Sequence, residues 1–260
     1  MRCLWTAATG MDAQQTNMNV IANNLANANT TGFKASRANF EDLMYQTLIP
    51  PGANNSNNGQ VPTGIQVGSG TTTASVEKIF SQGNFTQTGN NMDMAIQGNG
   101  FFQVQRGTQQ VYTRDGSFTV NQNGNVVDAD GYMLQPQITV PKTAVNISID
   151  PSGVMTCTDS SGNVVQTSNL QLYVFPNPGG LQSIGDNYYT QTPASGNPTS
   201  DTPGGPAGSG TILQGYLEAS NINVVNEMVN MIISQRAYEA NSKVIKSADQ
   251  MMQMANNVVS

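Results

Sequence analysis

The first part of the chain carries apolar residues at helical spacing. No proline occurs between residue 4 and residue 28, and apolar side chains recur there every seven residues. This spacing keeps the repeated positions on one face of an α-helix. The repeated positions are Leu4, Met11, Met18 and Leu25. The pattern predicts a helix that ends near the turn-forming sequence NTTG at 29–32.

The last part of the chain repeats this design. Its apolar positions at spacing seven are Val224, Met231, Tyr238, Ile245 and Met252. Asn221 or Asn223 is expected to cap this second helix, and Glu239 to pair with Lys243. We expect a second row at Met228, Gln235, Ser242 and Asp249. That row is too polar for a stable two-stranded coiled coil, so each helix needs further neighbours to bury its narrow stripe.

Between these ends the pattern changes to alternating apolar and polar residues, which is typical of strands. Examples are FFQV at 101–104, SFTV at 117–120, VNISI at 145–149 and LQLYVF at 170–175. Asn123-Gly124 is a strong signal for a hairpin turn. The segment 193–210 is rich in Pro, Gly, Ser and Thr and is expected to be a long loop. The sequence therefore predicts an α+β fold with a central antiparallel β-rich domain.

Three parts follow from this organisation. Residues 1–32 and 219–260 should form one terminal helical core, 33–74 an extended connector, and 75–218 a β-rich outer domain. Within the connector, 47–64 has almost no periodicity and includes the sequence PPGANNSNNG at 50–59. Such a composition is disordered in isolation, but a long irregular segment in a compact protein is often functional. Spacing alone leaves a mobile linker equally open.

Charge is scarce in this chain. Charged residues make up 10% of the sequence, whereas ordinary globular domains have roughly 25%. A surface of neutral amides and hydroxyls can meet copies of itself without a large cost of charge desolvation. A secreted β-protein with a bland surface fits the same composition. The net charge of −6 argues against nucleic acid as a partner. No apolar stretch is long enough to span a membrane, and the N-terminus lacks an ordinary secretory signal.

The sequence offers little catalytic chemistry. It contains no histidine, which removes Ser-His-Asp triads, most zinc sites and the usual general base. Cys157 has no histidine partner, and with Cys3 it makes no disulfide framework. The sequence DADG at 128–131 lacks the later ligands of a calcium loop and is interpreted as a turn. We expect no catalytic residue, cofactor, metal site or small-molecule substrate, although paired carboxylates that meet only in three dimensions stay open.

Several longer motifs resemble a known family. The sequences IANNLANANTTGFK at 21–34, GYLEASNINVV at 215–225 and QRAYEAN at 235–241 resemble the terminal signatures of bacterial flagellar rod and hook proteins. The sequences FEDLMYQT at 40–47, GIQVGSG at 64–70 and YTRDGSF at 112–118 are similar to distal-rod members of that family. The signature positions are Asn23, Asn24, Leu25, Asn27, Gly32, Phe33, Lys34, Glu218, Ser220, Asn221, Gln235, Arg236 and Tyr238.

The resemblance implies a structural subunit rather than an enzyme. The terminal helices would pair as a coaxial layer lining a hollow tube, the distal rod, which transmits motor torque to the hook and lets exported subunits pass. The rod crosses the periplasm and the outer membrane. The insertion at 47–64 would make the rod straight and stiff through Pro50, Pro51, Gly52, Asn54 and Asn58.

The resemblance also implies partners. These are further copies in a helical homopolymer, proximal rod proteins, the hook protein, the peptidoglycan and outer-membrane ring proteins, and the flagellar type III export apparatus. Export would need no cleavable signal. Phe40 and Met44 match a Phe-x-x-x-hydrophobic element proposed for export recognition, and packing in a core is the alternative for both.

Other functions remain open at this point. The chain could be another flagellar axial protein, such as a proximal rod or hook-like subunit. It could also be an extracellular β-module on a helical stalk, which fully apolar heptads would favour. A peptidoglycan hydrolase is a third possibility, and no motif in the sequence supports it.

Overall fold

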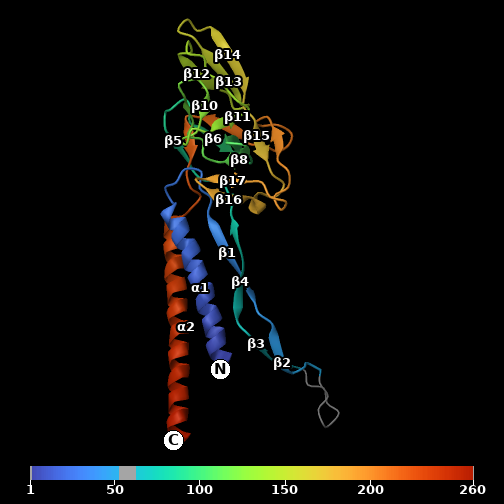
Figure 1. The fold of residues 1–260 in the computed structure, drawn as a ribbon, viewed down its shortest axis with the longest axis vertical. Coiled ribbons are helices and arrows are strands. Elements are labelled where there is room, and N and C mark those ends of the chain that lie inside the picture. The colour runs from blue at the N-terminus through green and yellow to red at the C-terminus, as the bar shows by residue number, and fades with distance from the viewer. Residues whose placement is uncertain (1, 53–62, 260) are drawn as a thin grey trace. The chain divides into compact units, whose positions relative to one another are not determined.

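The computed structural model of the protein describes residues 2–52 and 63–259, and it confirms the α+β class (Figure 1). Two long helices stand near the chain ends, α1 (Arg2–Ala26) and α2 (Val224–Val259), where the heptad spacing predicts them. All strands lie between them in the sequence. Neither helix, within the described residues, combines the length and apolarity required to cross a membrane.

The chain divides into two compact units. We call the first the helical unit; it comprises Met1–Ala26, Ser36–Glu77 and Asn223–Ser260. The second is the β unit, which comprises Asn27–Ala35 and Lys78–Ile222. Strands thus begin at residue 36, before the expected start of the β-rich domain at 75. The three-part domain division stays a prediction.

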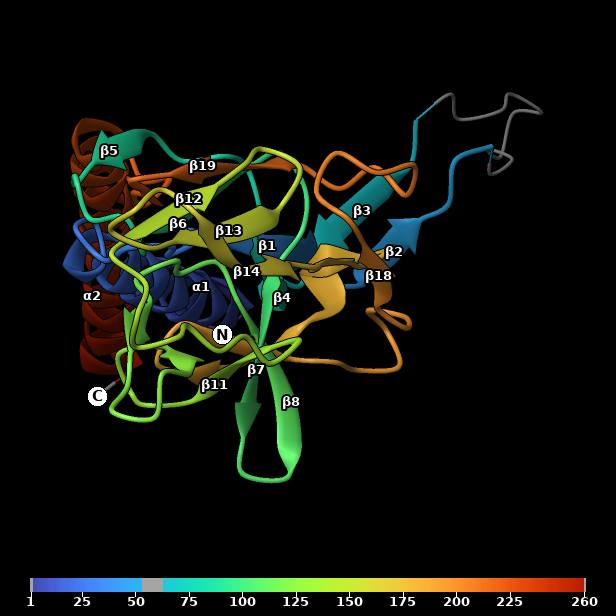
Figure 2. The ribbon, with the colours of Figure 1, turned by 90° about the horizontal axis from the view of Figure 1, so that it is seen from above.

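In the helical unit, α1 and α2 pack side by side and run antiparallel (Figures 1 and 2). Asn17 Nδ2 donates to Ser234 Oγ at 2.9 Å, and a Cβ placed on Gly10 would come within 2.9 Å of Asn241 Nδ2. Both contacts belong to one antiparallel register, because seven residues back along α1, from 17 to 10, correspond to seven residues forward along α2, from 234 to 241. Gly10 therefore lets the two helices approach closely, as small residues do at tight helix contacts.

The row of α2 that faces α1 differs from the expected one. Ser234 and Ala248 are buried and Asn241 is half-buried, whereas Gln235 and Asp249 are exposed. The row that faces α1 therefore follows the Met231–Tyr238–Ile245 row by three residues, whereas the expected row follows it by four. Its small side chains suit a close helix pair, so the prediction of a row through Gln235 and Asp249 is wrong.

The described residues of the helical unit also include four strands, which form two two-stranded sheets. The strands are β1 (Ser36–Asp42), β2 (Tyr45–Ile49), β3 (Ile65–Gly68) and β4 (Thr71–Lys78). β1 pairs with β4, and β2 pairs antiparallel with β3 (Figure 2). The outer parts of the irregular segment 47–64 are thus ordered: Thr47 and Ile49 pair in a ladder, and 51–52 form a turn.

The β unit contains the remaining strands. They are β5 (Phe85–Gln87), β6 (Met94–Gln97), β7 (Phe102–Arg106), β8 (Gln109–Thr113), β9 (Thr119–Val120), β10 (Val126–Val127), β11 (Met133–Gln135), β12 (Asn146–Ile149), β13 (Val154–Thr158), β14 (Val164–Asn169), β15 (Leu172–Val174), β16 (Gln182–Gly185), β17 (Tyr188–Thr190), β18 (Thr199–Asp201), β19 (Thr211–Gln214) and β20 (Tyr216–Glu218). A short 3₁₀ helix, η1, covers Pro178–Gly180.

These strands form several antiparallel sheets. The largest has seven strands in the order β16-β17-β8-β7-β11-β10-β9. A three-stranded sheet has the order β12-β13-β14, and the pairs β15-β18, β19-β6 and β20-β5 complete the set. The sequence signals at 101–104, 117–120, 145–149 and 170–175 correspond to β7, β9, β12 and β15. β18 lies inside 193–210, so that segment is not the uninterrupted loop expected.

Apolar side chains from these sheets meet in one main core. It includes Met94, Ile96, Phe102, Phe118 and Leu134, each at most 1% exposed. Phe102 and Phe118 pack edge to face, with ring centroids 5.2 Å apart and planes at 86°. Such pairs add specific geometry to the burial of apolar area.

Turn chemistry matches the expectations from sequence. Asn123-Gly124 lies between β9 and β10, and Gly124 has φ +85°, which glycine adopts without strain. Asp128 Oδ1 accepts the backbone N–H groups of Asp130 and Tyr132 at 3.1 and 2.9 Å. The sequence DADG at 128–131 is therefore a turn closed by its first aspartate.

Replacing Phe102 by Ala should lower the free energy of unfolding of the β unit by about 3–5 kcal/mol, because the change removes a buried ring and leaves a cavity. The measurement is urea unfolding followed by far-ultraviolet circular dichroism. Val145→Ala is the matched control, since Val145 is 72% exposed. Equal effects of the two substitutions would contradict this placement of the core.

Candidate assembly site

The outward surface of the helix pair is unusually apolar. At the start of α2, large apolar side chains are exposed on several faces, namely Val224, Val225, Met228, Val229, Ile232 and Ile233. Near its end, Val244, Met251, Met252 and Met254 are exposed as well. Exposed apolar patches of this kind on a folded chain mark surfaces that meet another protein.

The predicted helix stripes occupy an intermediate position. Six of the stripe residues are half-buried: Leu4, Met11, Met18, Leu25, Met231 and Ile245. The other three, Val224, Tyr238 and Met252, are more exposed. Most of the apolar side chains that are fully buried in the two helices are small ones beside the stripe, such as Ala7, Ala13 and Ala248, and Ile21 is the larger exception among the described residues. The stripes thus contribute to the pair and keep surface for further neighbours, and their role in polymerisation stays a prediction.

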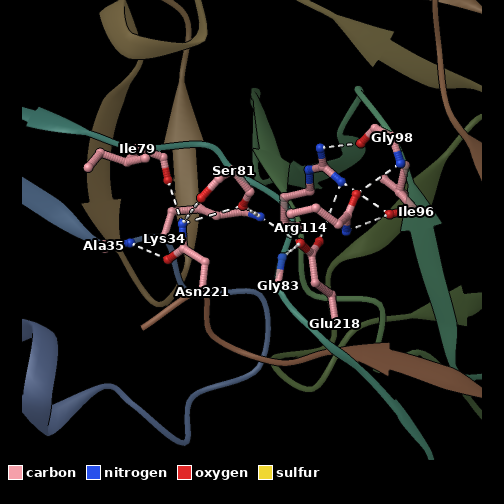
Figure 3. Close-up of polar contacts among 11 residues, drawn as sticks. Lys34, Ala35, Ile79, Ser81, Gly83, Ile96, Gly98, Arg114, Glu218 and Asn221 are labelled. Atoms are coloured by element: carbon pink, nitrogen blue, oxygen red, sulfur yellow. Dashed lines mark hydrogen bonds and ion pairs between the residues drawn. The ribbon is translucent and has the colours of Figure 1, made fainter. Parts of the chain in front are cut away.

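A buried cluster of charges forms the second feature, in the β unit (Figure 3). Glu218, at the end of β20, is 0% exposed, and its two carboxylate oxygens have different partners. Lys34 Nζ lies 2.6 Å from Oε1, and Arg114 Nη1 lies 3.4 Å from Oε2. Gly83 N–H also donates to Oε1 at 2.8 Å. One anion is therefore shared by two cations.

Backbone carbonyl groups solvate the remaining cationic charge. Lys34 Nζ donates to Ser81 O at 2.8 Å, and Arg114 Nη2 donates to Gly98 O at 2.7 Å. Burial lowers the pKa of Lys34, Arg114 lowers it further, and Glu218 opposes both. Burial also leaves Arg114 Nε without a hydrogen-bond partner among the described residues. The cluster needs every one of its members, because an unpaired charge here would have no access to water.

The cluster continues into a network that joins three segments of the β unit (Figure 3). Asn221 Oδ1 accepts Ala35 N–H at 2.8 Å, and Asn221 Nδ2 donates to Ile79 O at 2.8 Å. Ile79 N–H in turn donates to Ala35 O at 2.8 Å. Each segment lies close to the position where the chain passes to the helical unit, at 35–36, 77–78 and 222–223. We call Lys34, Arg114, Glu218 and Asn221, together with their backbone partners, the polar junction.

Two further signature residues have defined local roles. Gly32 has φ +68°, and a Cβ there would meet Asp115 N at 2.7 Å, so a larger residue would not fit. In the helical unit, Asn24 exchanges two hydrogen bonds with the backbone of Ser36, at 2.8 and 2.9 Å. Asn24 thereby fixes the end of α1 to the first residue of β1.

The other signature positions are more varied. Phe33 is buried beneath Lys78, whose Nζ lies 4.7 Å from the ring centroid. Arg236 pairs with Glu239 on the surface of α2 at 3.0 Å, where the sequence instead indicates Lys243 for Glu239. The cap of α2 is Asn223, whose Oδ1 accepts Asn226 N–H at 3.2 Å. The structure does not test a function for the remaining signature residues, which are Asn23, Leu25, Asn27, Ser220, Gln235 and Tyr238.

The remaining candidates lie in the helical unit. Phe40 is 37% and Met44 87% exposed, so core packing, the alternative for both, is wrong. Their role in export recognition stays a prediction. Pro50, Pro51 and Gly52 are exposed at the end of β2, while Asn54 and Asn58 lie outside the described residues.

Sequence reasoning missed Arg114 as a site residue and noted it only as part of YTRDGSF at 112–118. The low content of charged residues could have indicated Arg114, because a charged residue in a strand-rich region that becomes buried needs a partner of opposite charge. It also missed Gly83, whose added Cβ would lie 2.0 Å from Ala219 O.

These features define a class of protein: an α+β chain whose two ends form one antiparallel helix pair with an apolar outer surface. Three family models match it. They are the flagella basal body rod protein (residues 4–34), the flagellar hook protein FlgE/F/G D1 domain (95–157) and the flagellar basal body rod FlgEFG protein C-terminal (213–258).

Curated relatives agree along nearly the whole chain. The chain is 50% identical over 252 residues to the flagellar basal-body rod protein FlgG of Buchnera aphidicola subsp. Schizaphis graminum, covering 96% of each. It is 47% identical to FlgG of Caulobacter vibrioides, covering 99% of each, and 46% identical to FlgG of Agrobacterium fabrum, covering 96% and 97%. The chain belongs to the FlgG family of flagellar basal-body rod proteins.

Membership confirms the resemblance found in the sequence. The chain is a structural component of the bacterial flagellum, located in the rod of the basal body. It assembles there with other rod and hook components.

Glu218→Gln should lower the free energy of unfolding by about 3–5 kcal/mol, because it leaves Lys34 and Arg114 as two buried cations without their anion. Chemical unfolding at neutral pH measures the change. Glu77→Gln is the matched control, since the Arg37–Glu77 pair is exposed at 62% and 41% and should change stability little. A stable Glu218→Gln variant would show that the carboxylate charge is not needed.

Proposed function

We propose that this chain is the subunit of the flagellar distal rod, which polymerises into a straight hollow shaft. The observation that carries this proposal is the helix pair built from both chain ends, whose large apolar side chains face outward. A folded monomer gains nothing from exposing them, whereas lateral packing of many pairs would bury them. Identity of 46–50% to FlgG proteins over nearly the full chain supports this member of the rod and hook family.

In such a shaft the helix pairs would form the inner layer around a channel. Apart from its apolar patches, the surface of the helices offers mostly amides, such as Gln15, Asn19 and Gln235, all exposed. A polar and uncharged lining lets unfolded export substrates pass without strong binding. The β unit would form the outer wall and meet the rings in the peptidoglycan and outer membrane, while proximal rod proteins and the hook protein would adjoin the two ends of the shaft.

The polar junction suits the transmission of torque. A rotating shaft needs subunits that do not deform, and this hydrogen-bonded network ties three distant segments of the β unit together. Catalysis plays no part in this function, so we propose that the chain is not an enzyme. Export through the flagellar type III apparatus, with Phe40 and Met44 as recognition residues, belongs to the same proposal.

Purified protein at high concentration should form hollow filaments visible by electron microscopy. Ser234→Glu should abolish them, because Ser234 is 2% exposed against α1 and a carboxylate there would separate the helices. Ser160→Glu, at an exposed turn of the β unit, is the control and should assemble normally. Filaments formed equally well by Ser234→Glu would mean that the helix pair is not the assembling element.

The segment 47–64 is proposed to stiffen the shaft by lying between neighbouring subunits. Deleting 50–59 should leave assembly intact but give filaments of shorter persistence length, measured from their curvature in electron micrographs. A control insertion of two glycines after Ser160, in the turn between β13 and β14, should leave the filaments straight. Straight filaments from the 50–59 deletion would remove the stiffening role.

A further inference from the structure

Helix α2 consists of three sections that differ in charge. Residues 224–235 contain a single charged residue, Glu227, and 250–259 contain none. The intervening section contains Arg236, Glu239, Lys243, Lys246 and Asp249. The two uncharged sections can therefore enter a contact at low desolvation cost, whereas the middle section favours water.

The first section presents an apolar face away from α1. Val225, Val229 and Ile232 follow the spacing four and three, which puts them on one side of the helix. That side is opposite to Ser234, which is buried against α1. Val225 is 69% exposed and Ile232 56%. We call these three residues the head face.

The last section extends beyond α1 (Figure 1). In the register set by Asn17–Ser234 and Gly10–Asn241, Arg2 lies level with Asp249. About ten residues of α2 follow, which span roughly 15 Å. Met251, Met252 and Met254 are exposed on this extension, and we call them the methionine tip. Met252 follows Ser234 by 18 residues, or five helical turns, so it lies on the side of α2 that faces α1 and continues that side past the end of α1.

We propose that the methionine tip of one copy packs on the head face of a second copy. The inference rests on the proposed function, because it specifies one contact of the polymer. The two surfaces belong to opposite ends of one rigid helix, so they cannot meet within a chain. Their helix-dipole charges are complementary, because the tip lies at the C-terminal end of α2 and the head face at the N-terminal end. The thioether side chains of methionine also adapt well to a face of branched residues.

The contact is head-to-tail and uses two different surfaces of each copy. A contact of this kind forms a ring when the rotation between copies closes, and an open helical filament when it does not. The proposed contact is of the second kind and can extend along an axis. The exposed methionines thus make α2 a longitudinal connector, while the rest of the helix pair stays available for lateral neighbours.

Disulfide cross-linking tests this contact in assembled filaments. In a Cys3→Ser background, which removes the exposed native thiol, Ile232→Cys and Met254→Cys are prepared as separate proteins, mixed and assembled before mild oxidation. We expect covalent dimers between the two variants. Lys243→Cys replaces Ile232→Cys in the control, because Lys243 is exposed on the same side of α2 within its charged section. Equal cross-linking of Met254→Cys to both positions would overturn the inference.

Assembly without cross-linking therefore refutes the tip contact and leaves the proposed function standing. Failure of the Cys3→Ser background and of the unchanged protein to assemble at all refutes both.

A second measurement uses the doubly substituted variant Met251→Gln with Met254→Gln. Both side chains are exposed, so circular dichroism and the unfolding temperature should stay unchanged. The critical concentration for assembly should rise roughly tenfold or more, which corresponds to about 1.4 kcal/mol per contact. Lys243→Gln is the matched control and should leave the critical concentration unchanged. An unchanged value for the methionine variant would contradict the proposal.

Discussion

The buried carboxylate of Glu218 is the constraint on which the arrangement of the β unit depends. A carboxylate withdrawn from water is stable only where cations and N–H groups replace its hydration. Here Lys34, Arg114 and Gly83 supply these groups from three distant parts of the sequence. Satisfying one anion therefore fixes the segment after α1, the start of the β unit and its last strand in one place.

The helix pair follows the opposite principle. The contacts between its helices use mainly small or polar residues, such as Gly10, Asn17 and Ser234, while many large apolar side chains of α2 stay exposed. This distribution limits the hydrophobic stabilisation of the isolated pair, because these exposed side chains stay in water. This exposed apolar area would contribute to stability only when other copies of the chain cover it. The same choice of side chains thus limits hydrophobic burial within the chain and leaves apolar surface for association between chains.

Much of the fold follows from the sequence, because the periodicity of apolar residues is a local signal. The heptad rows place both helices, and alternation marks β7, β9, β12 and β15. The register of the helix pair does not follow, since it depends on which small residues meet across more than two hundred positions. The polar junction cannot be predicted from the sequence for the same reason. Motifs mark Lys34, Glu218 and Asn221 as family positions. Only the three-dimensional structure shows that Arg114 belongs with them and which partner each residue has.

The separation of the two helices along the sequence also determines when the pair can exist. Asn17 and Ser234 are 217 positions apart, so α2 leaves the ribosome long after α1. Contacts between such distant segments form late in folding, because a large loop must close first. A chain interrupted during synthesis carries α1 without its partner and cannot form the helix pair. The topology therefore makes the helix pair a check on chain length, because α1 is paired along its whole length only in molecules translated past Ala248.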